Sequence, residues 1–279
     1  SLGHSIYGWV QESRKHHLLN LICQQANLIL GYFFLDQLFG SRIALLSMLI
    51  FSVHPIGMQA VAWISGVNYV LCLTFALVTL NLSLFLVPSF LQSVLSLGSA
   101  YLSSLFFLPG CFTWLILLYI NQNSVAFMAF LAGVAVLAVG GKEVLSYRVK
   151  AFQNQHMGKS TMIYWRKLII LPKTFLYYLF FIPFPKRLGL FHTWGYHFEE
   201  TLEHVDWRFH IGVLLAIGLS FYAYIAPPEV RFGIIWFFVY IILFLNFITA
   251  QQFVSERYAF LPAFGFCIIL AYFLQNYIP

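Results

Sequence analysis

The chain has 279 residues, of which 61% are hydrophobic and 9% are charged, and its formal net charge is +6. Soluble domains carry about 25% charged residues, so the composition excludes a soluble protein, because too few polar side chains are present to coat a surface. Apolar runs recur along the whole length. They are continuous rather than alternating, which favours membrane-spanning helices over the short strands of a β-barrel.

In chain order, these runs predict an all-α polytopic membrane protein with about nine membrane segments. The segments are residues 17–38, 41–53, 66–87, 89–108, 111–120, 124–141, 211–225, 232–249 and 259–278. The simplest organisation is a single transmembrane domain over residues 1–279, in which the short segment 111–120 suits a re-entrant stretch. The polar opening residues lack the apolar core of a signal peptide. The first residue is Ser rather than Met, so we expect a start that is processed, trimmed or incomplete.

Residues 142–208 predict a basic and aromatic loop between the sixth and seventh segments. Nine of the 15 basic residues of the chain lie within residues 142–187. The apolar stretch LIILPKTFLYYLFFIPFP is interrupted by Pro172, Pro183 and Pro185, which predicts a helix that lies in the membrane interface rather than spanning the bilayer. The basic residues suit contact with lipid phosphates, or they retain the loop in the cytoplasm by the positive-inside rule.

The densest titratable cluster follows in the same loop. Its members are His192, His197, Glu199, Glu200, Glu203, His204 and Asp206. Glu200 and His204 are four residues apart, so with His197 they are the candidates for a metal site on one helix face. The spacing matches no metalloprotease signature, and a solvated amphipathic helix is the favoured interpretation, so no metal is expected. The four cysteines lie in apolar segments without CxxC spacing and are expected to be core residues.

Two acid–base pairs stand at the ends of apolar segments. Lys142 and Glu143 follow the sixth segment, and Glu256 and Arg257 precede the ninth. Ionisable groups at such positions are costly to bury and are usually paired or functional. Each pair is therefore either an ion pair that fixes a helix end or part of a polar substrate site.

Five stretches resemble, in the same order, the transmembrane and tetratricopeptide-repeat (TMTC) O-mannosyltransferase family and its bacterial relatives. They are HHLLNLICQQANLIL, HPIGMQAVAWISGVNYVLCLTF, GGKEV, LPKTFLYYLFFIPFPKRLGLFHTWG and SERYAFLPAFGFC. In the family, His-Pro closes one span, a Ser-Lys-Glu element follows later, and a Glu-Arg-Tyr-x-Tyr-Leu-Pro-Ser segment comes last. The ordered set, which touches most of the chain, carries the resemblance.

The resemblance implies a GT-C-like helical bundle with one large non-cytoplasmic loop. Enzymes of that type pass a sugar from a polyprenyl-phosphate donor to an acceptor, and no other cofactor is expected. An inverting transfer needs a carboxylate base for the acceptor hydroxyl, and cations or hydrogen-bond donors for the departing phosphate. By this resemblance the donor-phosphate candidates are Arg257, Lys142, Tyr258 and His54, and the base candidates are Glu143 and Glu256.

The order of the predicted crossings brings the family-like elements to one side of the membrane. If His54 faces outside, the Lys142-Glu143 and Glu256-Arg257 pairs and the large loop also lie outside. A basic loop outside opposes the positive-inside rule, which weakens for loops of about sixty residues. We follow the topology that the motifs imply.

The chain also departs from the family at positions that look catalytic there. Gly57 and Gln59 stand where the family has His and Glu, and Val67, Asn68 and Tyr69 stand where it has Arg, Ala and Asp. The family's acidic first loop, a pair of spans and the repeats have no counterpart in these 279 residues. The alternative function is therefore a non-catalytic structural or accessory subunit of a larger membrane complex.

The expected partners follow from these two functions. They are membrane lipids and, on the second interpretation, other membrane subunits, whereas no nucleic acid is expected. A transporter or channel is less favoured, because the apolar segments contain almost no charge to mark an ion path and show no inverted repeat. The predicted location is a membrane, as a multi-pass integral protein.

Overall fold

A computed structural model describes residues 13–63, 66–85, 98–99, 102, 113–121, 164–185, 205–242 and 255–277. Within these ranges the chain forms only helices and their connections, which confirms the all-α class. The helices are α2 (Ser13–Phe39), α3 (Ser41–Val53), α4 (Gly57–Ala62), α5 (Val67–Phe85), α7 (Thr113–Asn121), α9 (Tyr164–Phe181), α11 (Trp207–Ile225), α12 (Pro228–Ile241), the 3-10 helix η4 (Glu256–Ala259) and α13 (Phe260–Tyr277).

Four of the described helices are long and apolar enough to cross a membrane. They are His17–Phe39, Val67–Phe85, Trp207–Ile225 and Glu256–Tyr277. The protein is thus a multi-pass integral membrane protein. The predicted total of nine segments stays a prediction, because segments 89–108 and 124–141 lie almost entirely outside the described residues.

An aromatic core joins the first part of the chain to its C-terminal helices. Trp236 of α12 is fully buried, and its ring lies 4.7 Å from that of Phe264 and 6.5 Å from that of Phe34, centroid to centroid. Its indole nitrogen donates a hydrogen bond to the carbonyl oxygen of Leu261 at 2.9 Å. Gly233 and Gly265 face each other so closely that a Cβ on either would meet the other's carbonyl oxygen, which lets α12 and α13 pack tightly.

Buried amides join α2 to the segments beside it. The side-chain nitrogen of Asn20 donates to the carbonyl oxygens of Val61 at 3.1 Å and Trp63 at 2.9 Å, and Asn27 donates to Val70 at 3.1 Å. On α5, Asn81 reaches back to Leu30 at 3.0 Å. Interhelical hydrogen bonds of this kind supplement packing where lipid removes much of the hydrophobic driving force.

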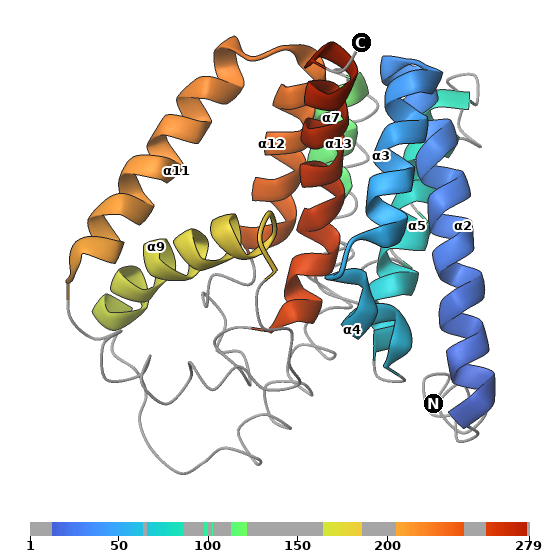
Figure 1. The fold of residues 1–279 in the computed structure, drawn as a ribbon, viewed down its shortest axis with the longest axis horizontal. Helices are drawn as coiled ribbons and strands as arrows, with labels where there is room; N and C mark the ends of the chain where they lie inside the picture. The colour runs from blue at the N-terminus through green and yellow to red at the C-terminus, as the bar shows by residue number, and fades with distance from the viewer. Residues whose placement is uncertain are drawn as a thin grey trace.

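Helix α9 runs across the bundle, whereas α3, α12 and α13 run along it (Figure 1). The helix predicted in the aromatic loop is present as α9. It has Pro172 inside it and ends at Phe181, before Pro183 and Pro185. Its position in the membrane interface stays a prediction. Helix α11 leans away from the bundle and meets α9 near its start, where Gly212 lies directly against the Pro172 backbone.

Candidate functional site

The candidate site lies at the end of the bundle where α4, η4 and the start of α13 come together (Figure 1). Three of the predicted residues, Glu256, Arg257 and Tyr258, form a single turn of η4 there. This turn is short, so its position depends on contacts from other elements. Those contacts come from α4, α5 and α9.

A tyrosine of α9 fixes the residue that precedes the turn. The hydroxyl of Tyr178 donates to the carbonyl oxygen of Ser255 at 3.2 Å and accepts from the Ser255 amide at 3.0 Å. Tyr178 is fully buried and Ser255 is 2% exposed. A buried hydroxyl that is satisfied on both sides holds the η4 backbone at the end of α9.

Arg257 is held through both its backbone and its side chain. Its amide donates to Oε1 of Gln59 at 2.9 Å, and its Nε donates to Oγ of Ser255 at 3.1 Å. The guanidinium lies 5.8 Å from the ring centroid of Trp63 and 5.9 Å from that of Tyr258, within the range of cation–π attraction. The cation is therefore oriented by aromatic faces at the end of the bundle.

Glu256 is a buried carboxyl beside a second tyrosine of α9. It is only 3% exposed. Burial raises the pKa of Tyr177, and the charge of Glu256 raises it further, so the two groups lie close enough to interact. A buried carboxylate needs polar partners to offset its desolvation, and this one lies in a turn that also carries a guanidinium. The site thus combines the Glu256 carboxyl, the Arg257 guanidinium and several phenol hydroxyl groups.

His54 lies at the same end of the bundle as η4 but makes different contacts. Its Nδ1 accepts the Ile56 amide at 3.3 Å, and its ring packs edge-on against Phe266 at 6.0 Å. Burial lowers the pKa of His54, although a backbone hydrogen bond with Ile182 partly opposes this. His54 therefore stacks on α13 beyond η4 rather than pairing with the Arg257 turn in the described contacts.

The remaining predicted site residues lie outside the described residues. These are Lys142, Glu143, His197, Glu200 and His204. Within the ranges that the structure covers, no group of three or more His, Cys, Asp or Glu side chains is placed to hold a metal ion.

Sequence reasoning missed two of the residues that build the site. Gln59 was noted only as a departure from the family, yet it accepts the Arg257 amide. Tyr178 gave no signal, because one tyrosine among the 16 in an aromatic chain looks like packing. Only the fold, which brings residues 178 and 255 together, identifies its role.

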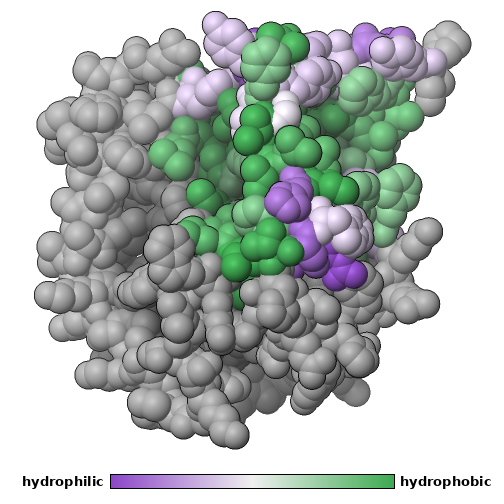
Figure 2. Space-filling view, turned by 90° about the vertical axis from the view of Figure 1, so that its left-hand side faces the viewer, coloured by the Kyte–Doolittle hydropathy of each residue, from purple (hydrophilic) through white to green (hydrophobic). Residues whose placement is uncertain are grey.

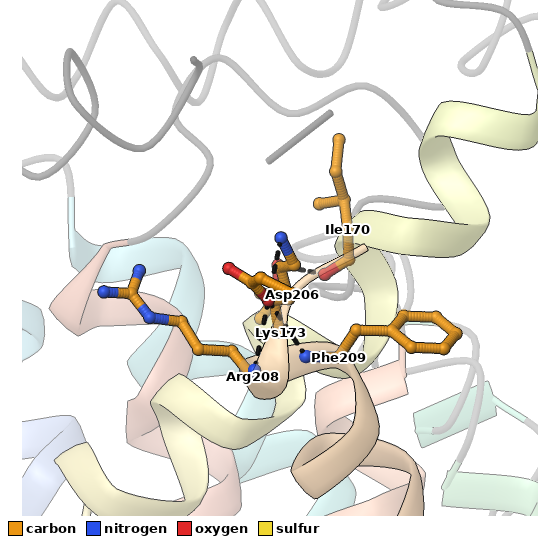
Figure 3. A network of polar contacts seen from close by, with 6 residues as sticks. Ile170, Lys173, Asp206, Arg208 and Phe209 are labelled. Carbon is orange, nitrogen blue, oxygen red and sulfur yellow. Dashed lines mark hydrogen bonds and ion pairs between the residues drawn. The ribbon is translucent and has the colours of Figure 1, made fainter. Parts of the chain in front are cut away.

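A second polar cluster joins α9 to α11 (Figure 3). Nζ of Lys173 lies 3.1 Å from Oδ1 of Asp206, and the lysine side chain is 1% exposed. The same oxygen caps α11 by accepting the amides of Arg208 at 3.1 Å and Phe209 at 3.2 Å. Asp206 belongs to the titratable loop cluster, and here it has a structural role.

The charge state of Asp206 follows from these contacts. Partial burial opposes ionisation, but the hydrogen bonds from Lys173 and the Phe209 amide, with the charges of Lys173 and Arg208, outweigh it. The pKa of Asp206 is therefore held below its usual value. An ionised aspartate at the first turn of α11 is also favoured by the helix dipole.

Comparison of the sequence with protein-family models, with curated proteins and with solved structures finds no match. No family is assigned to the chain by these comparisons. The functional argument therefore rests on the chain's own residues.

Proposed function

We propose that the protein is a GT-C-type membrane glycosyltransferase-like protein that binds a polyprenyl-phosphate-linked sugar at the η4 end of the bundle. The observation that supports this is Arg257, a cation oriented by Trp63 and Tyr258 and held by Gln59 and Ser255. Guanidinium groups bind phosphate through paired hydrogen bonds. An isoprenoid chain would lie in the bilayer beside the apolar helices.

Each residue of the turn has a role in this proposal. Arg257 binds the lipid phosphate, and Tyr258 lies beside it with its ring 6.3 Å from that of Tyr69. Glu256 is the base candidate within the described residues, since it is a buried carboxyl in the same turn as Arg257. Glu143 is the second base candidate and Lys142 the second phosphate ligand.

Binding of a lipid-linked donor tests the proposal directly. Purified chain in detergent is titrated with fluorescent polyprenyl-phosphate mannose, for wild type and for Arg257→Gln. Loss of a charged hydrogen-bonded contact is expected to weaken binding about tenfold or more. Arg42→Gln is the matched control, because Arg42 is exposed in the first turn of α3 at the other end of the bundle. Equal affinity for all three proteins contradicts the proposal.

A non-catalytic subunit of a larger membrane complex is the second candidate. It is favoured by α11, because only 6% of this candidate span is buried. Its exposed apolar side chains include Leu214, Ile217 and Phe221. This function predicts a native assembly heavier than the chain alone, and Phe221→Ala should reduce its size on a native gel. A monomer that binds the lipid-linked donor excludes this second candidate.

A further inference from the structure

A cavity of about 550 Å³ lies at the opposite end of the bundle from η4, between α7, α11 and α12. Its volume is in the range of small-molecule sites. The lining includes Tyr119 of α7, Ser220 and Tyr224 of α11, and Arg231 and Phe238 of α12. Among the described residues that line it, Arg231 is the only charged one.

Arg231 is placed at the level where α11 ends. Its Nη2 donates to the carbonyl oxygens of Tyr224 at 3.1 Å and Ala226 at 3.2 Å, which are among the last carbonyls of that helix and its cap. Its Nε is buried and has no hydrogen-bond partner among the described residues. Because Trp207–Ile225 is a candidate span, its end marks the boundary between the apolar and polar layers of a bilayer.

The rest of the lining runs from Arg231 into the apolar layer. On α12 the lining residues recur at helical spacing, from Arg231 through Ile234 and Ile235 to Phe238. This row covers about 10 Å at 1.5 Å per residue. On α11 the lining residues Tyr224, Ala223 and Ser220 descend beside it. One charged group thus stands at the head of an otherwise mostly apolar groove.

Figure 2 shows the face of the molecule that carries α11, with hydrophobic residues gathered over most of the described surface. The side chains of Tyr224 and Phe221 are 80% and 68% exposed. In a membrane such a face is surrounded by lipid. The groove is therefore accessible to a lipid molecule from the bilayer itself.

We propose that this groove binds an anionic phospholipid, with the phosphate on Arg231 and one acyl chain along α11 and α12. Charge complementarity selects the occupant, since the described lining offers a guanidinium and no carboxylate. A zwitterionic lipid brings its own cation close to Arg231 and is disfavoured. Basic pockets between membrane helices are a known form of site for anionic headgroups.

The proposal is tested by native mass spectrometry of the purified full chain. Phosphatidylglycerol and phosphatidylcholine with identical acyl chains are offered at equal concentration. Wild type is expected to retain phosphatidylglycerol about fivefold better, the ratio expected for one basic residue near a membrane surface. Arg231→Gln should lose this preference, whereas Arg42→Gln should keep it.

A second pair of variants tests the space in the groove independently of the charge of Arg231. Ser220→Trp places a large ring in the cavity from an exposed helix position and leaves Arg231 intact. Gly218→Trp is its matched control, because a Cβ at Gly218 meets no atom within 4 Å and Gly218 does not line the cavity. Ser220→Trp should reduce retention of both lipids, and Gly218→Trp should leave it unchanged.

Three results would overturn the proposal. They are an unchanged phosphatidylglycerol preference in a folded Arg231→Gln variant, equal lipid retention by the two tryptophan variants, and displacement of the lipid by inorganic phosphate alone. The last result would mean an anion site that needs no acyl chain. If Arg231→Gln fails to fold, because the end of α11 loses its arginine cap, the tryptophan pair decides the question.

Discussion

Asp206 connects the charge of single residues to the stability of the fold. Its Oδ1 accepts two amides of α11 and lies 3.1 Å from Nζ of the buried Lys173. Removing one partner of a buried ion pair leaves the other charge without compensation. The lysine is the more buried of the two, so loss of the aspartate destabilises the fold mainly because the Lys173 charge stays buried without it.

We expect Asp206→Asn to lower the free energy of unfolding by about 3 kcal/mol at neutral pH. The double variant Lys173→Met/Asp206→Asn should recover part of this loss, because the buried charge is removed with its partner. Thermal unfolding in detergent measures both changes. If the double variant is less stable than the single one, the ion pair is not the cause of the loss.

The same residue sets a pH dependence. Because the folded pKa of Asp206 lies below its unfolded value of about 3.9, ionised Asp206 stabilises the fold above that value. This stabilisation is lost as the pH falls through the lowered folded pKa. Wild type should therefore lose more stability than Asp206→Asn between about pH 6 and pH 3. Equal losses in the two proteins contradict this assignment.

At the scale of elements, the crossing of α9 and α11 depends on one glycine. A Cβ at Gly212 would clash with the carbonyl oxygen and carbon of Pro172, which are backbone atoms and cannot move away by rotating a side chain. At Gly218 of the same helix, a Cβ meets nothing within 4 Å. The two positions therefore form a matched pair.

Gly212→Ala should lower the unfolding free energy by about 1–3 kcal/mol, because the added methyl forces the two helices apart. Gly218→Ala should be neutral or stabilise by up to about 1 kcal/mol, the difference in helix propensity. Thermal unfolding of both variants tests this. A neutral Gly212→Ala would show that α9 and α11 do not pack as described.

The sequence predicted elements better than contacts. Runs of apolar residues located α2, α3, α5, α11 and α13, because length and hydrophobicity decide which segments enter a membrane. Residues 168–185 were predicted to form an interfacial helix; α9 is present there and ends before Pro183 and Pro185, and its position in the interface stays a prediction. Hydropathy carries no information on which helices meet, so the roles of Gly212 and Tyr178 could not be predicted.

The candidate site shows the same difference between what the sequence predicts and what only the contacts of the fold reveal. Glu256 and Arg257 were predicted because charge at the edge of an apolar run is costly and therefore informative, whereas Tyr258 was predicted only through the family resemblance. Gln59 is separated from Arg257 by 198 positions and is neutral, so only the fold reveals that it holds the turn. His54 was predicted with them; its ring packs against Phe266, and its part in donor binding stays a prediction.

At the scale of the whole molecule, the helix directions place α4, η4 and the start of α11 at one end (Figure 1). The starts of α3 and α12 lie at the other end. Cysteines introduced at Met58 and Val205, which are 65% and 54% exposed, should thus react with an impermeant maleimide from one side of the membrane. Cysteines at Ser41 and Pro228 should react from the other side. Labelling of all four from one side contradicts this topology.

The most direct test of the central claim is a density map of the purified chain with a polyprenyl-phosphate-linked sugar. The account predicts a phosphate in contact with the Arg257 guanidinium, next to Trp63 and Tyr258, with the isoprenoid chain leaving between apolar helices. A map in which side chains fill the η4 end, or in which phosphate appears only at Arg231, would contradict it.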